Sequence, residues 1–303
     1  MADQKRIPNG VKFAFGGIAG MGATLFVQPL DLVKNRMQLS NKEYKSSFHA
    51  LRSIIANEGA FNLYKGLSAG LARQATYTTT RLGVYTWLFE RFSEPNKAPS
   101  FLMKAVLGMS AGAVGAFVGT PCEVALIRMT SDGRLPPDQR RNYKNVFNAV
   151  GRIYGEEGLF ALWRGCIPTI GRAMVVNAAQ LATYSQAKQI ILDTKYIQDG
   201  IFCHFWASMI SGLVTTIASM PVDIAKTRIQ NMRIIDGKPE YTGAVDVLRK
   251  VVKNEGVFAL WKGFTPYWAR LGPHTVLTFI ILEQMNSAYL NLVSKSSSKP
   301  GTV

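Results

Sequence analysis

The sequence lacks most of what a disulfide-bonded, metal-binding or catalytic protein needs. Three cysteines occur among 303 residues (Cys122, Cys166 and Cys203), and no two of them form a CxxC pair. An odd count at scattered positions predicts neither a disulfide framework nor a zinc site. No triad spacing, metal-ligand cluster or phosphate-binding loop is present either. The sequence therefore predicts no enzyme, no cofactor and no metal.

Acidic residues and N-terminal targeting signals are also scarce. The chain has 19 Asp and Glu against 35 Lys and Arg, a formal net charge of +16. Such a charge suits nucleic acid, an anionic membrane surface or small anionic ligands. The basic residues are scattered and not clustered with exposed aromatics, which argues against nucleic acid. The stretch MADQKRIPNGVKF has no apolar signal core and no Arg/Ser-rich presequence, so we expect any membrane targeting to be internal.

What the sequence does contain is one unit written three times. PLDLVKNRMQ (29–38), PCEVALIRMT (121–130) and PVDIAKTRIQ (221–230) share the pattern Pro-x-acid-x-x-(base)-x-Arg. A second motif follows each of them: EGAFNLYKG (58–66), EGLFALWRG (157–165) and EGVFALWKG (255–263). Self-similarity at a fixed period indicates repeated structural units. We predict repeats at 1–99, 100–199 and 200–291, followed by a tail at 292–303.

Each unit has two long apolar segments separated by a short amphipathic helix. Segments 11–38, 101–130 and 201–230 precede these helices, and segments 67–92, 167–191 and 265–291 follow them. Each is long enough to cross a hydrocarbon layer of about 30 Å. The sequence therefore predicts an all-α membrane protein with six spans and both termini on one side. A soluble helical solenoid is the alternative, but its units are usually shorter and its helices need a polar face.

These motifs resemble the signature of the mitochondrial carrier family, over about residues 10–291. The resemblance implies six tilted helices in a pseudo-threefold bundle around a central cavity, with alternating access in the mitochondrial inner membrane. It also implies termini toward the intermembrane space and a functional monomer. The polar stretches that join the two spans of a unit carry 16 Lys and Arg, which weakly supports a matrix location for them. Segments LARQATYTTTRLGVYT and ARLGPHTVLTFI resemble members that exchange 2-oxoglutarate for malate.

The proline motifs predict a gate at the matrix end. Proline removes a helical hydrogen bond and kinks a span, and an acid and a base three residues apart share one helical face. The resemblance implies the pairs Glu123–Lys226 and Asp223–Lys34. Leu126 stands where the partner of Asp31 belongs, so we expect two ion pairs and an unpartnered Asp31. Charges that extend to a membrane interface are the simpler alternative. The predicted matrix gate comprises Pro29, Asp31, Lys34, Gln38, Pro121, Glu123, Pro221, Asp223, Lys226 and Gln230.

Two further sites follow from the resemblance. At the other end of the even-numbered spans, only Lys188 and Glu283 keep the charges of the family's second gate, so we expect at most one ion pair there. Gly66, Gly165 and Gly263 each precede an even-numbered span. Backbone N–H groups at a helix start bind anions, so these glycines are candidates for cardiolipin phosphate. A plain turn glycine is an equally good interpretation.

Arginines inside the predicted spans indicate the substrate. Arg73, Tyr77 and Arg81 fall on one stripe of a helix, and Arg172 and Arg270 lie at the depth of Arg73. An arginine in a bilayer is costly unless it faces a wet cavity or a partner, and no acid lies on these stripes. Guanidinium groups form bidentate hydrogen bonds with carboxylates, so several arginines favour a small dicarboxylate as the substrate.

These five residues are the predicted substrate site, and the resemblance implies that the substrates are 2-oxoglutarate and malate, exchanged by antiport. Two other activities stay open at this point: exchange of dicarboxylate for phosphate, and a proton leak activated by fatty acids. A basic membrane-associated scaffold is the alternative outside transport.

Overall fold

The computed structural model describes residues 8–40, 44–92, 101–193, 201–232, 234–235 and 238–297. Six long helices lie where the sequence predicts spans, which confirms the predicted fold class. They are α1 (Asn9–Leu39), α3 (Leu67–Phe92), α4 (Phe101–Ser131), α6 (Cys166–Asp193), α7 (Ile201–Asn231) and α9 (Phe264–Ser297). Helix α9 continues past the predicted end at residue 291. Helices α1, α4 and α7 continue through Pro29, Pro121 and Pro221.

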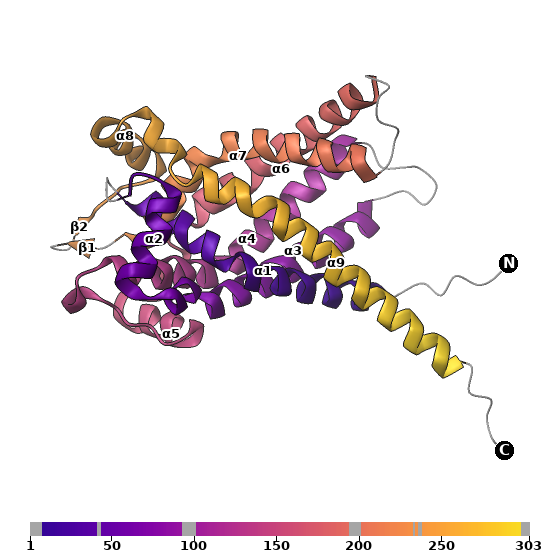
Figure 1. Ribbon diagram of the computed structural model, residues 1–303, viewed down its shortest axis with the longest axis horizontal. Coiled ribbons are helices and arrows are strands. Elements are labelled where there is room, and N and C mark those ends of the chain that lie inside the picture. Colours follow the sequence, from indigo (N-terminus) through magenta and orange to yellow (C-terminus); the bar gives the residue numbers. More distant parts are fainter. Residues whose placement is uncertain are drawn as a thin grey trace, which may run out of the picture.

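The long helices form a closed ring. Within each repeat α1 packs against α3, α4 against α6 and α7 against α9; between repeats α3 packs against α4, α6 against α7 and α9 against α1. Figure 1 shows α1 beginning and α9 ending at one end of this bundle, opposite to the short helices. The arrangement has the pseudo-threefold order that the repeated sequence predicts.

Three short helices cover the end of the bundle where the proline motifs lie. They are α2 (Ser47–Glu58), α5 (Val146–Glu157) and α8 (Ala244–Glu255), and each buries apolar residues four apart, such as Ile153 with Ala149. Each ends at a glycine with φ between 86° and 91°. These glycines are Gly59, Gly158 and Gly256. A positive φ favours glycine because it has no Cβ, so the glycine of each acid-Gly motif terminates its helix.

Short turns complete each repeat. The 3-10 turns η1 (Ala60–Tyr64), η4 (Leu159–Trp163) and η5 (Val257–Trp261) connect the short helices to the even-numbered spans. Two more 3-10 turns, η2 (Asp132–Arg134) and η3 (Pro137–Gln139), follow α4, and strands β1 (Ile234–Ile235) and β2 (Lys238–Pro239) pair after α7. The predicted repeat boundaries near residues 99 and 199 lie outside the described residues and stay a prediction.

Hydropathy separates the long helices into two groups. Within the described residues, four segments are long and apolar enough to cross a membrane: Ala14–Leu39, Ala105–Arg134, Leu159–Gln180 and Trp206–Asn231. Helices α3 and α9 are not among them, although the 26 residues of α3 would reach about 39 Å at 1.5 Å per residue. Polar side chains such as Arg73 and Arg81 lower the hydropathy of α3, because one face of this helix lines an internal cavity.

Candidate functional site

Two ion pairs join the proline motifs of neighbouring repeats at the matrix-gate end. Lys34 Nζ lies 2.7 Å from Asp223 Oδ2, and Lys226 Nζ lies 2.6 Å from Glu123 Oε1. All four side chains are buried. These are the two pairs that the family resemblance implies, and they link α1 to α7 and α7 to α4.

The two glutamines of the predicted gate have different partners. Gln230 Nε2 donates to Glu123 Oε2 at 3.3 Å and so supports the Glu123–Lys226 pair. Gln38 Oε1 accepts from the hydroxyl of Thr227 at 2.8 Å, and its amide nitrogen lies 3.9 Å from the sulfur of Met220. Gln38 therefore joins α1 to α7 through Thr227, which lies one helical turn after Asp223.

Asp31 has a partner, so the prediction that it lacks one is wrong. Its carboxylate forms an ion pair with Arg270 Nη1 at 2.5 Å. The reason is that α1 packs closely against α9, which carries Arg270, whereas Leu126 is buried and offers no charge. Leu126 thus leaves Asp31 without a lysine partner in the ring, and Arg270 is the cation that pairs with it.

In the other two repeats the gate acid keeps its lysine and also contacts a cavity arginine. Arg73 Nη1 lies 3.9 Å from Glu123, and Arg172 forms an ion pair with Asp223. The stripes themselves carry no acid, as predicted, but the neighbouring odd-numbered helices supply one each. Every gate acid therefore contacts one predicted substrate arginine.

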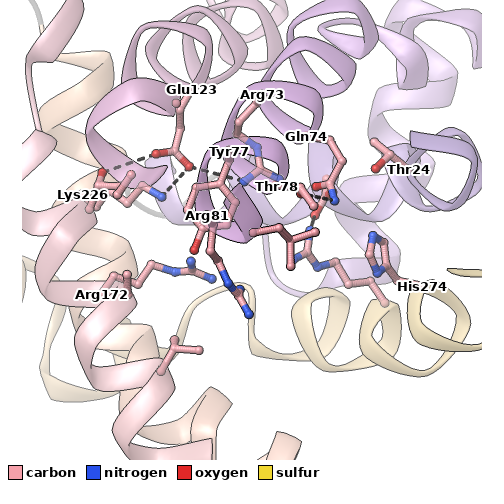
Figure 2. A pocket seen from close by; sticks show the side chains of 18 residues that line it. Thr24, Arg73, Gln74, Tyr77, Thr78, Arg81, Glu123, Arg172, Lys226 and His274 are labelled. Atoms are coloured by element: carbon pink, nitrogen blue, oxygen red, sulfur yellow. Dashed lines mark hydrogen bonds and ion pairs between the residues drawn. The ribbon is translucent and has the colours of Figure 1, made fainter. Parts of the chain in front are cut away.

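The predicted substrate residues line one cavity of about 370 Å³. This volume lies in the range of small-molecule sites. Figure 2 shows Arg73, Tyr77 and Arg81 projecting from α3 toward the space that Arg172 enters from α6. His274 of α9 also lines the cavity, together with all five predicted residues: Arg73, Tyr77, Arg81, Arg172 and Arg270.

The cavity and its floor carry an excess of positive charge. Six cationic side chains (Lys34, Lys226, Arg73, Arg81, Arg172 and Arg270) face three acids (Asp31, Glu123 and Asp223) in the cavity or in the smaller hollow below it. Three positive charges are therefore left over. Arg81 has no acidic partner within the described part of the chain. An anion with two carboxylates would offset most of this excess.

Close helix packing positions the α3 stripe. A Cβ on Gly119 would lie 3.3 Å from Tyr77 Cβ, and one on Gly115 would lie 3.1 Å from Arg81 Cβ. Small residues at four-residue spacing let membrane helices approach each other. The two glycines of α4 therefore set the depth at which Tyr77 and Arg81 enter the cavity.

Tyr267 is a site residue that sequence reasoning missed. It is 4% exposed, and its hydroxyl accepts from Arg172 Nη2 at 2.9 Å. The centre of its ring lies 4.2 Å from Lys34 Nζ and 5.3 Å from the guanidinium carbon of Arg270. A ring face attracts cations, so Tyr267 stabilises Lys34, Arg172 and Arg270 between the cavity and the gate. Its position three residues before Arg270, on the same helical face, could have indicated this role.

The last arginine of each proline motif was also given no role from sequence. Arg36, Arg128 and Arg228 each donate through Nε to a backbone carbonyl of the next repeat, those of Thr130, Gln230 and Gln38, at 3.0, 3.3 and 3.2 Å. Their guanidinium groups also form ion pairs with Glu58, Glu157 and Glu255. These contacts connect the three repeats in a ring and attach each short helix to it.

The pKa values of the three glutamates follow from these contacts. Burial alone would raise the pKa of each carboxyl, but the paired arginine and other nearby cations together outweigh burial and hold the pKa below its ordinary value. Arg164 adds a second contact to Glu157 at 2.8 Å, and Lys262 contacts Glu255 as well. The three carboxylates are therefore stabilised in their charged form.

Gly66, Gly165 and Gly263 pack against the gate segment of the next repeat. Their φ angles are 83°, 81° and 85°. A Cβ would lie 2.9 Å from Thr130 in the first case, 2.8 Å from Gln230 in the second and 3.2 Å from the Lys34 carbonyl in the third. These contacts favour the interpretation as turn glycines. Lipid binding at these positions stays a prediction.

The predicted cytoplasmic gate lies on two helices. Lys188 is half-buried on α6, and Glu283 is exposed on α9. Pairing between them stays a prediction.

Comparison with known proteins decides the family. The family model described as mitochondrial carrier protein matches three consecutive segments, residues 5–96, 97–195 and 198–292. The chain belongs to the mitochondrial carrier family. The three matched segments correspond to the three pairs of long helices in the structure.

Relatives within the family are carriers by name. A protein of Caenorhabditis elegans named mitochondrial 2-oxoglutarate/malate carrier protein is 73% identical over 299 residues, or 97% of this chain and 98% of its own. The human protein of that name is 73% identical over 291 residues, covering 94% and 93%. Mitochondrial uncoupling protein 5 of Arabidopsis thaliana is 41% identical over 303 residues, covering 91% and 97%.

Proposed function

We propose that this carrier exchanges 2-oxoglutarate for malate or related dicarboxylates across the mitochondrial inner membrane. The observation that carries the proposal is the cavity: arginines from all three repeats meet there with an excess of three positive charges. A dianion offsets two of these three charges, and each of its carboxylates can form a bidentate contact with one guanidinium group. The names of the relatives at 73% identity support the choice of substrates.

The shared partners suggest how substrate opens the matrix gate. Arg73, Arg172 and Arg270 contact Glu123, Asp223 and Asp31 in the gate-closed arrangement. A bound dicarboxylate competes with those acids for the same guanidinium groups. The acids then lose a partner, so the gate opens more readily with substrate than without it. An empty carrier stays closed, which makes the transport an obligatory exchange.

The setting of the activity follows the same proposal. The proline motifs face the matrix, both termini face the intermembrane space, and the monomer is the working unit. Lys188 and Glu283 belong to the cytoplasmic gate, and cardiolipin binds near Gly66, Gly165 and Gly263. The backbone at these three helix starts supports the lipid contact.

Exchange in liposomes tests the proposal. Purified protein is reconstituted with malate inside, and labelled 2-oxoglutarate is supplied outside. We expect uptake into loaded vesicles and almost none into empty ones. Equal uptake into both would exclude antiport. Strong inhibition of this uptake by phosphate would instead indicate a dicarboxylate/phosphate carrier.

Substitution of Arg172 tests the site itself. Arg172→Ala removes a cavity cation and leaves Asp223 with Lys34, so the gate pair survives. Loss of one buried charged contact costs about 2–5 kcal/mol, so we expect exchange to fall by at least about thirtyfold. Arg52→Ala, an exposed arginine of α2, is the matched control. Wild-type exchange by Arg172→Ala would remove this residue from the site.

The similarity to an uncoupling protein supports a second candidate. A proton leak activated by fatty acids would need no dicarboxylate in the vesicle. Proton conductance of the same vesicles, measured with fatty acid and without substrate, distinguishes the two functions. We expect it to stay at the level of protein-free vesicles.

A further inference from the structure

The aromatic residue of the second motif contacts the gate helix at the carbonyl that the gate proline affects. Trp163 Nε1 lies 3.1 Å from the carbonyl oxygen of Phe117, and Trp261 Nε1 lies 3.1 Å from that of Ile217. Phe117 precedes Pro121 by four residues, and Ile217 precedes Pro221 by four. The same geometry thus occurs in two repeats.

This register has a specific chemical meaning. In a helix the carbonyl of one residue accepts from the N–H four residues later, and proline has no N–H. The carbonyls of Phe117 and Ile217 have therefore lost their usual donor. Their side chains lie on the outer surface of the bundle, where Phe117 is 52% exposed and Ile217 is 46% exposed. In the proposed membrane setting that surface would face lipid, where no water can replace the lost donor.

We propose that Trp163 and Trp261 are positioning residues that cap the carbonyls left without a donor by Pro121 and Pro221. The indole N–H replaces the missing backbone N–H. Each cap joins the turn before an even-numbered span to the proline of the preceding odd-numbered span. It fixes α4 and α7 at the proline, two residues before the gate acid of each helix.

The ring contact of the second repeat supports the same role. The rings of Trp163 and Phe117 have centroids 5.7 Å apart at an angle of 32°. The indole therefore packs on the side chain of the residue whose carbonyl it caps. Packing and hydrogen bond together hold η4 against α4.

The first repeat lacks this cap. The residue four before Pro29 is Leu25, and the aromatic residue of that repeat is Tyr64, which is 46% exposed. Among the described residues, no side chain donates to the Leu25 carbonyl. The inference therefore predicts an asymmetry: α4 and α7 have capped bends, and α1 does not. Tyr64→Phe is consequently a matched control.

A double-mutant cycle on thermal unfolding tests the cap. Trp163→Phe keeps an aromatic ring and removes the N–H, so the unfolding temperature should fall by about 2–4 °C. Pro121→Ala restores a backbone N–H for the Phe117 carbonyl. In that background Trp163→Phe should cost much less, because the carbonyl has regained its own donor. Equal losses in both backgrounds would overturn the proposal.

A second measurement isolates the N–H from the packing. Replacing Trp163 by benzothienylalanine substitutes sulfur for the indole N–H at nearly unchanged shape, and it should lower the unfolding temperature as Trp163→Phe does. Wild-type stability with this analogue would show that only packing matters. In ¹⁵N-tryptophan spectra, the Nε1–H signals of Trp163 and Trp261 should exchange slowly with deuterium, and fast exchange of both would contradict the cap.

The role of the caps in gating rests on the proposed transport function. The controls test whether the caps exist independently of transport. Tyr64→Phe should leave the unfolding temperature unchanged, and a loss as large as that of Trp163→Phe would contradict the predicted asymmetry. Neither thermal unfolding nor N–H exchange requires transport. If the carrier fails to exchange 2-oxoglutarate for malate, these readouts still decide whether the caps exist.

Discussion

At the residue scale, the cavity arginines belong to two systems at once. Arg172 illustrates this: it lines the cavity, pairs with Asp223 of the gate and donates to the Tyr267 hydroxyl. In the proposed function a substrate carboxylate and Asp223 would therefore compete for the same guanidinium group. Tyr267 keeps Arg172, Arg270 and Lys34 close to one ring and reduces their mutual repulsion.

Substitution of Tyr267 tests this role. Tyr267→Phe keeps the ring for the cations and removes the acceptor of Arg172, a hydrogen bond to a charged group worth about 1.5–3 kcal/mol. We expect the exchange rate to fall by about tenfold or more in reconstituted vesicles. Tyr289→Phe, on the same helix and packed on Phe15, is the control and should exchange normally. An unchanged rate for Tyr267→Phe would show that its hydroxyl is dispensable.

At the element scale, each repeat fixes its short helix to the gate segment of its neighbour. The links are the arginines at the ends of α1, α4 and α7, which bind a glutamate of their own repeat and a carbonyl of the next. Close packing of Gly66, Gly165 and Gly263 against those segments adds a second link. Each short helix is therefore attached to the gate segments of two repeats.

The Glu157 link should make stability depend on pH. The pKa of Glu157 is lowered in the folded protein, so its contribution is complete above the unfolded pKa near 4.5 and is lost as pH falls through the folded value. Glu157→Gln should destabilise the protein by about 1.5 kcal/mol at pH 7 and by less at low pH. Thermal unfolding across pH measures both.

The neighbouring Glu156 provides a matched control for this experiment. It pairs with Arg152 on the surface of α5, with half of its side chain exposed. Such pairs contribute between about 0 and 1 kcal/mol. Glu156→Gln should therefore change stability little, and a loss equal to that of Glu157→Gln would contradict the special role of the Arg128 link.

Leu126 breaks the pattern of the gate, because the other two proline motifs carry a lysine at this position. It shares a small hollow with Asp31 and Arg270. A lysine there can reach Asp31, add a third pair between the proline motifs and release Arg270. Leu126→Lys should stabilise the matrix-closed state and slow exchange, with Leu126→Met as the control. Exchange by Leu126→Lys that is as fast as or faster than wild type would refute this account of the gate.

At the scale of the whole molecule, the charge of the cavity sets an expectation for the proposed exchange. The cavity carries a positive excess, but both proposed substrates are dianions, so a one-for-one exchange moves no net charge. The proposed exchange would therefore need neither a proton nor the membrane potential. In the proposed function the arginines of the three repeats would hold the substrate in the cavity that they line together.

Electroneutral exchange can be measured directly. A potassium diffusion potential, set with valinomycin across malate-loaded vesicles, should leave the initial rate of 2-oxoglutarate uptake unchanged. Reversing the sign of the potential provides the internal control. A rate that rises with one polarity and falls with the other would show that net charge moves in each cycle.

Much of the architecture could be read from the sequence because it is periodic. The three proline motifs, the six long segments and the stripe at Arg73, Tyr77 and Arg81 depend on spacing along one chain, and spacing survives folding. The pairs Glu123–Lys226 and Asp223–Lys34 required the family resemblance as well, since they join different repeats. The contacts of Asp31 and Tyr267 could not be predicted, because their partners come from other helices that no local sequence pattern brings together.

The sequence by itself determined the number of spans, the threefold order and the presence of a cationic cavity. These follow from the cost of placing arginine in a bilayer and from the repetition of one folding unit. The tertiary structure decided which acid meets which arginine, that Tyr267 lies among three cations, and that two indoles reach the carbonyls before Pro121 and Pro221. Those contacts depend on how α1, α4, α7 and α9 pack across repeats, and packing distances are not encoded in the spacing of any single segment.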